Sequence, residues 1–124
     1  MDASRYEFES LTVERLETAD SVRIKFLGKS MAREPAKQLL PVLTDALERC
    51  TQTGKTMVLD FTKVEYMNSS TITPVIRLIE RVRRGSGKLE VRYNKNLKWQ
   101  EVSFSALDVF ATEDGRVKIV GQAN

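Results

Sequence analysis

The stretch from Met57 to Arg84 constrains the fold more than any other part of the chain, because it joins a short apolar run to an amphipathic helix. The run Met57–Leu59 predicts a buried strand, with Asp60 at its end. The helix that follows has apolar residues at positions i, i+3, i+4, i+7 and i+10, which are Ile72, Val75, Ile76, Ile79 and Val82. Gly85 predicts the end of this helix.

Four small hydrogen-bonding residues, Asn68, Ser69, Ser70 and Thr71, stand between the strand and the helix. Such residues are poor inside helices but good at helix caps. Pro74 is tolerated only in the first turn, where a backbone N–H has no intrahelical partner. This favours a helix that starts late, with Thr71 as its cap and with Ser69 and Ser70 exposed in the turn before it.

The remaining patterns predict a single α/β domain over residues 1–124, with residues 1–10 as an edge or frayed segment. Alternation predicts an antiparallel hairpin of Leu11–Leu16 with Ser21–Leu27. Helical patterns then alternate with short strands at Leu89–Tyr93 and Arg116–Val120. This order predicts a mostly parallel mixed sheet with an N-terminal antiparallel hairpin, covered by about three to four helices.

The composition argues against catalysis and against metal binding. The chain has no histidine and one cysteine, Cys50, so it lacks the commonest general base and the ligands of a typical zinc site. It has no glycine-rich phosphate loop, and we expect no cofactor. Without a long apolar run or a signal-peptide pattern, we predict no membrane insertion and a cytoplasmic location.

A basic cluster lies between Arg77 and Lys88 in a chain whose net charge is only +3. Nucleic-acid binding is one interpretation of such a cluster. A solvated helix end, with cations placed favourably near the negative end of the helix dipole, explains the cluster better.

The strand ending in Asp60, followed by Asn68-Ser69-Ser70-Thr71-Ile72 and an apolar helix, resembles the STAS domain of anti-sigma factor antagonists. The usual pattern there is a strand ending in Asp-Leu and then Asp-Ser-Ser-Gly-Leu. The resemblance extends over roughly Val13 to Val120, and it includes the late segment Ser105–Phe110. It implies the STAS fold.

The resemblance also implies a bacterial signalling switch that regulates transcription through partner binding. In the family the second serine, here Ser70, is phosphorylated by a serine kinase, often an anti-sigma factor with a GHKL-type fold. A PP2C-type phosphatase reverses this step. The unphosphorylated form binds the kinase partner and frees its client. The partner-binding residues carried over are Asn68, Ser69, Ser70, Thr71 and Ile72, although periodicity alone places Ile72 in the core.

This chain departs from the family pattern at Asn68, where the family has Asp, and at Thr71, where it has Gly. Ser69 and Thr71 therefore remain alternative phosphorylation sites. One alternative function is a non-phosphorylated STAS adaptor or subunit that holds a larger regulatory or transport complex together. A weaker alternative is a small basic nucleic-acid-binding domain. The sequence leaves the kinase and the oligomeric state open.

Overall fold

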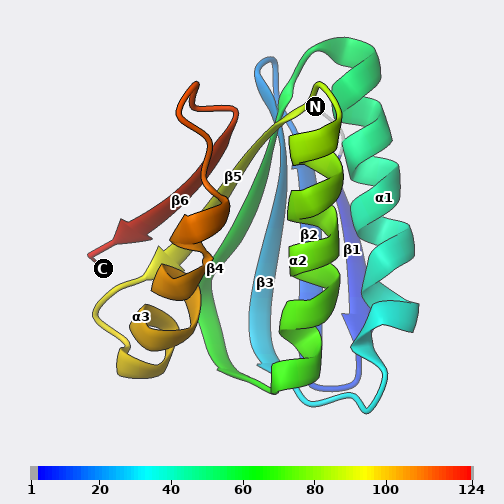
Figure 1. Ribbon diagram of the computed structural model, residues 1–124. Helices are drawn as coiled ribbons and strands as arrows, with labels where there is room; N and C mark the ends of the chain where they lie inside the picture. The colour runs from blue at the N-terminus through cyan, green and yellow to red at the C-terminus, as the bar shows by residue number, and fades with distance from the viewer. Residues whose placement is uncertain (1–2, 124) are drawn as a thin grey trace.

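A computed structural model describes residues 3–123 of the chain. Within this range six strands form one sheet in the order β1-β2-β3-β4-β5-β6 (Figure 1). The strands are β1 (Ala3–Phe8), β2 (Leu11–Glu17), β3 (Ser21–Ser30), β4 (Thr56–Met67), β5 (Lys88–Asn94) and β6 (Val117–Gln122). The helices are α1 (Pro35–Thr53), α2 (Ser69–Arg84), α3 (Lys98–Ser105) and the 3-10 helix η1 (Ala106–Phe110).

The pairing of the strands confirms the predicted α/β fold with a mixed sheet. Strands β1, β2 and β3 are antiparallel, so β1 extends the predicted β2–β3 hairpin by one more strand at the edge. Strands β3 to β6 are parallel to one another. Each parallel pair is joined through a helix, as parallel strands require.

The helices α1, α2 and α3 all lie on one face of the sheet (Figure 1). Successive right-handed crossovers that move in one direction along the sheet produce this arrangement. On the opposite face, paired positions alternate in charge from strand to strand, in the row Arg5, Glu14, Lys25, Asp60 and Arg92. This polar row explains how a largely parallel sheet leaves one face without helices.

The core lies between the sheet and its helices. Aromatic rings join the two layers, because Phe61 of β4 stacks on Phe26 at 4.4 Å and contacts Phe104 of α3 at 4.9 Å between ring centroids. All three side chains are at most 1% exposed. Their burial anchors α3 to the sheet beside β4.

Gly28 allows the β1–β2 turn to approach β3 closely. Its φ of +92° favours glycine, and a Cβ at this position would lie 2.3 Å from the carbonyl oxygen of Ser10. The neighbouring Lys29 N–H donates a 3.0 Å hydrogen bond to the same carbonyl. Any larger residue would therefore push this turn away from the end of β3.

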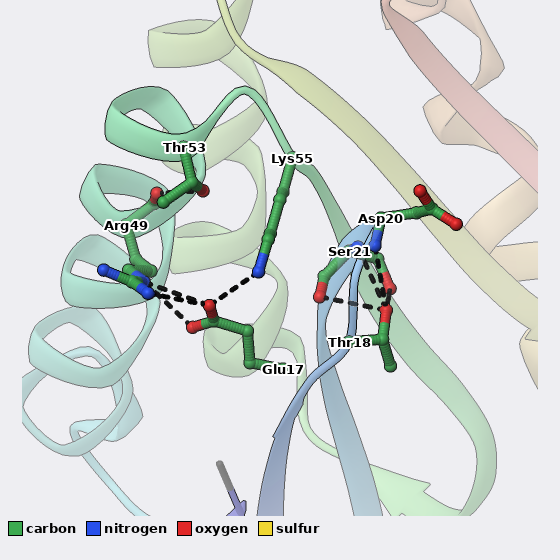
Figure 2. Close-up of polar contacts among 7 residues, drawn as sticks. All are labelled: Glu17, Thr18, Asp20, Ser21, Arg49, Thr53 and Lys55. Atoms are coloured by element: carbon green, nitrogen blue, oxygen red, sulfur yellow. Dashed lines mark hydrogen bonds and ion pairs between the residues drawn. The ribbon is translucent and has the colours of Figure 1, made fainter. Parts of the chain in front are cut away.

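Glu17, at the end of β2, ties the C-terminal end of α1 to the sheet (Figure 2). Its carboxylate accepts hydrogen bonds from Arg49 Nε and Nη2, both at 2.9 Å, and from Lys55 Nζ at 2.7 Å. Glu17 is only 8% exposed. The hydrogen bonds from Arg49 and then Lys55 lower the pKa of Glu17 to about 2.

Strand β4 does not end at Asp60, as the sequence suggested, but continues to Met67. Pairing with β5 stops at Asp60, and two register shifts against β3 mark irregularities beyond that point. Asp60 Oδ1 accepts hydrogen bonds from the backbone N–H and hydroxyl of Thr62, at 2.9 and 2.6 Å. Asp60 therefore lies inside β4 rather than at its end, and its hydrogen bonds to Thr62 stabilise the irregular part of the strand that follows.

Gln100 of α3 satisfies the backbone groups exposed where β4 departs from β5. Its Nε2 donates to the carbonyl oxygens of Phe61 and Val64 at 2.8 and 3.0 Å, and its Oε1 accepts from Asn94 N–H at 2.7 Å. Gln100 is fully buried. A buried amide with both ends paired therefore positions the last part of β4, from which the chain enters α2.

Candidate functional site

The serine turn, which we define as Asn68–Thr71, connects the end of β4 to α2. Because β3 and β4 are parallel, both end at the same edge of the sheet, and the first turn of α2 lies beside the end of β3 (Figure 1). The backbone N–H of Asn68 donates to the carbonyl of Ser30 at 3.0 Å. The turn is therefore attached to a strand that precedes it by almost forty residues.

Asn68 is the N-cap of α2. Its Oδ1 accepts hydrogen bonds from the backbone N–H of Thr71 at 3.2 Å and from the Thr71 hydroxyl at 2.8 Å. Its Nδ2 donates to the carbonyl oxygen of Ala32 at 2.9 Å. An aspartate at this position could cap the helix, but it could not donate to Ala32. The amide thus serves both the helix and the segment that follows β3.

Thr71 is buried, with 1% exposure, and its hydroxyl lies 2.7 Å from the Ser30 hydroxyl. Because Thr71 donates to Asn68, the hydrogen atom shared with Ser30 comes from Ser30. The Ser30 side chain is also buried, at 3% exposure. This chain of hydrogen bonds holds the first turn of α2 against the sheet.

The prediction that Thr71 caps the helix is wrong. Helix α2 begins at Ser69, three residues earlier than a Thr71 cap requires, and Pro74 lies inside it. The reason is that Thr71 points into the core toward Ser30, which leaves Asn68 to cap the backbone. Pro74 has no N–H to offer the carbonyl of Ser70 four residues earlier. Ser70 is exposed, so water can reach the first turn.

Ser69 and Ser70 are both exposed, as expected, although they are the first helical residues rather than part of a preceding turn. The first turn of α2 contains no acidic residue, whereas its last turn contains Arg81, Arg83 and Arg84. The helix dipole therefore places uncompensated positive character beside two accessible hydroxyl groups.

The surroundings of the serine turn are partly apolar. Met31, next to Ser30, is 53% exposed, and Tyr66, two residues before Asn68, is 49% exposed. Ile72 is half-buried and packs against the core, as does Ile76. The predicted apolar face of α2 is thus rotated, with Leu78 and Thr71 inside and with Ile72 and Ile76 at its flank.

The C-terminal end of α2 is held by Arg116, which precedes β6. Its Nη1 donates to the carbonyl oxygens of Val82 and Gly87, both at 3.1 Å, and its Nη2 donates to that of Arg83 at 3.2 Å. This contact satisfies carbonyls that a helix end otherwise leaves unpaired. Within the predicted basic cluster, Arg83 and Arg84 are exposed.

Sequence patterns missed the two residues that support the turn from β3 and the segment after it, namely Ser30 and Ala32. They follow Gly28 and carry no distinctive motif. Their role depends on the parallel pairing of β3 with β4, which joins segments far apart in the chain. Among residues 3–123, no three or more histidine, cysteine, aspartate or glutamate side chains gather as metal ligands would.

Residues 40–95 match the family model of the STAS domain. The predicted resemblance to the STAS family is confirmed. The matched segment runs from within α1 to just beyond β5, and it contains the whole serine turn.

Two solved structures share the fold of this STAS-like chain. One is an anti-sigma factor antagonist from Mycobacterium paratuberculosis, with 15% identity, a TM-score of 0.62, and coverage of 86% of this chain and 91% of that one. The other is SiaC of Pseudomonas aeruginosa, with 18% identity, a TM-score of 0.61 and full coverage of both chains. No curated protein sequence matches the chain significantly. Across residues 3–123, no helix is long and apolar enough to span a membrane.

Proposed function

We propose that this chain is a partner-switching regulator that is reversibly phosphorylated at Ser70 and that binds its kinase partner when Ser70 is unmodified. The observation that carries the proposal is the exposure of Ser69 and Ser70 between two residues, Asn68 and Thr71, that are locked by hydrogen bonds. A rigid turn with free hydroxyls suits both a kinase and a binding partner. The STAS match and the antagonist-like fold support the same conclusion.

Burial separates the three candidate phosphorylation sites. Thr71 is 1% exposed and bonded to Ser30 and Asn68, so a kinase would have to extract it from the core. Ser69 and Ser70 need no such movement. Ser70 takes precedence because it occupies the family's second-serine position, and Ser69 is its alternative.

A phosphate on Ser70 would bring a charge of about −1.5 to −2 to a helix N-terminus that has no acidic residue. The helix would tolerate this charge, whereas a partner docked on the turn would meet new bulk and repulsion. Hydrogen bonds hold α2 at both ends, through Ser30 and through Arg116. The proposed switch therefore works by blocking the surface, without rearranging the fold.

The proposed partners follow from the family resemblance. They are a serine kinase with a GHKL-type fold, acting as an anti-sigma factor, and a PP2C-type phosphatase that removes the phosphate. The chain itself would act by binding rather than by catalysis, in the cytoplasm. Exposed Met31 and Tyr66 beside the turn would contribute apolar contacts to the kinase.

The deciding experiment is peptide mass spectrometry on the protein purified from its own cells, alongside Ser70→Ala, Ser69→Ala and Ser105→Ala variants. Ser105 is an exposed serine outside the turn and serves as the matched control. We expect a phosphate on Ser70 that disappears only in Ser70→Ala. A phosphate on Ser69 instead would support the phosphorylation switch but would refute the assignment of Ser70 as its site.

Absence of phosphate under every growth condition would refute the switch and favour the non-phosphorylated adaptor. Binding to nucleic acid that weakens steeply with salt would instead favour the basic-domain alternative. In that case substitution of exposed Arg83 and Arg84 should reduce the binding.

A further inference from the structure

The α3–η1 segment has two apolar sides, and only one of them is buried. Phe104 and Leu107 face the core with 0% and 4% exposure. On the outer side, Val102 is 62% exposed and Val109 is 78% exposed. These are the two most exposed large hydrophobic side chains of residues 3–123. We call Val102, Ala106 and Val109 the valine stripe.

The valine stripe follows helical spacing. Val102 and Ala106 stand four residues apart across the end of α3, and Ala106 and Val109 stand three residues apart in the 3-10 helix η1. Each spacing is about one turn of the helix it spans, so the three residues share one side. Ala106 is exposed between the two valines and is small enough to let another helix approach closely. Trp99 lies three residues before Val102 and is half-buried at the start of the same side.

Folding alone gives no reason for valines at these positions. A single exposed apolar side chain is common on protein surfaces and needs no explanation. β-Branched residues, however, are weak helix formers, and a solvent-facing helical position favours alanine or charged residues. One such valine lies in α3 and the other in η1. Together with Ala106 between them, they form a continuous apolar strip on the outer side of this segment.

Carboxylates border this strip. Glu101 and Asp108 each stand one position before a valine, and both lie near Tyr93. Asp108 is exposed, whereas Glu101 is half-buried and accepts a hydrogen bond from the Tyr93 hydroxyl, so Asp108 is the more accessible charge of this acidic edge. Residues 98–115 contain one basic residue, Lys98, and four acidic residues, so their net charge is −3. The acidic residues are Glu101, Asp108, Glu113 and Asp114. Because the whole chain carries +3, the remaining residues carry +6. The stripe thus lies in an acidic region of a basic protein.

We infer that the valine stripe docks an amphipathic helix of a partner protein, with lysine or arginine side chains along the edge that faces Glu101 and Asp108. The apolar strip and its acidic border match such a helix in both hydrophobicity and charge. The docking site is separate from the serine turn and does not depend on phosphorylation. It adds a second binding surface to the proposed regulator.

Trp99 provides a built-in reporter, because it is the only tryptophan of the chain. The probe is a short synthetic amphipathic helix of leucine and lysine, and a matched leucine–glutamate peptide is the control. We expect the leucine–lysine peptide alone to shift the Trp99 emission in a saturable way. The double variant Val102→Ser/Val109→Ser should weaken this binding at least about tenfold.

Two further variants sharpen the test. Asp108→Asn should weaken binding and reduce its salt dependence, because one attractive charge is lost. Leu16→Ser removes an exposed apolar side chain of β2, outside the stripe, and should leave binding unchanged. Circular dichroism should show the same thermal midpoint for the double variant and the unmodified chain, since the serines replace solvent-facing groups.

The inference is overturned if the leucine–lysine peptide produces no shift, if both peptides bind alike, or if the double variant binds as well as the unmodified chain. A concentration-dependent Trp99 shift of the protein alone, abolished by the double variant, would also overturn it. In that case the occupant would be a second copy of this chain.

Discussion

The Ser30 hydroxyl lies 2.7 Å from the Thr71 hydroxyl, and this contact joins the end of β3 to the first turn of α2. Both residues are buried, and Thr71 passes the hydrogen-bond chain on to Asn68. The two exposed serines therefore stand on a turn whose inner side is tied to the sheet. Hydrogen bonds with Ser30 of β3, a strand distant in the sequence, therefore hold the proposed binding surface in place.

Replacement of Thr71 by valine should destabilise the protein by about 1–3 kcal/mol, because the buried Ser30 hydroxyl loses its acceptor and Asn68 loses a donor. Valine keeps the shape of threonine, so packing is preserved. Urea denaturation measures the change. The exposed Thr73→Val variant is the control and should shift the free energy of unfolding by less than about 0.5 kcal/mol.

The same pair predicts non-additivity. Because Ser30→Ala and Thr71→Val break one shared contact, the double variant should lose less stability than the sum of the single variants. Additive losses would contradict the hydrogen bond as the cause.

A negative charge at Ser70 should stabilise α2. The first turn has no acidic residue, so Ser70→Asp should raise the free energy of unfolding by about 0.3–1 kcal/mol at low salt. Arg84→Asp places the same charge in the last turn and should have the opposite sign. Thermal denaturation at low and high salt measures both effects. Equal signs would show that the dipole is not responsible.

Loss of Arg116 should loosen the C-terminal end of α2. Arg116→Ala removes the hydrogen bonds to Val82, Arg83 and Gly87 and should cost about 1.5–3 kcal/mol. Hydrogen exchange should accelerate most in the last turn of α2 and in the Gly85–Gly87 connection. Arg84→Ala, at an exposed position of the same turn, should leave this exchange nearly unchanged.

Acid should weaken the attachment of α1 to β2. The pKa of Glu17 is about 2 in the folded chain, below its ordinary value of 4.5. The carboxylate therefore contributes stability above about pH 4.5, and this contribution disappears as the pH falls toward 2. Comparison of urea denaturation between pH 2 and pH 6 for the unmodified chain and Glu17→Gln measures it.

The two proteins should differ most in stability near neutral pH and converge at pH 2, where Glu17 becomes protonated. A difference that stays constant over this range would contradict the ion cluster with Arg49 and Lys55 as its origin. The matched variant Glu65→Gln, at an exposed position of β4, should show no such convergence.

Sequence patterns predicted most of the fold because the spacing of apolar residues along the chain indicates which side of each strand or helix is buried. Alternation in Ser21–Leu27 marked β3, and the apolar run Met57–Leu59 marked the buried part of β4. The helical spacing after residue 70 correctly indicated α2, although its buried side is centred on Val75, Leu78 and Val82. Such patterns were sufficient for the order of elements from β2 onward. Both serines are exposed as expected, although the expectation rested on a Thr71 cap that the structure does not have.

Patterns failed where a side chain finds its partner far away in the sequence. Local rules for Pro74 favoured Thr71 as the cap, but Ser30 draws Thr71 into the core and Asn68 takes over. Asp60 resembled the end of a strand, yet β4 continues because Gln100 satisfies the carbonyl groups that leave the β5 pairing. Neither partner is visible from local spacing.

Local patterns in the chain were enough to predict the order of elements from β2 onward, the amphipathic character of α2 and the two serines near its start. The cap of α2, the full length of β4 and the solvent exposure of the valine stripe on α3–η1 emerged from the folded arrangement. The physical reason is that periodicity depends on neighbours a few residues apart. Buried hydrogen bonds and surface exposure depend instead on which distant segments the sheet brings together.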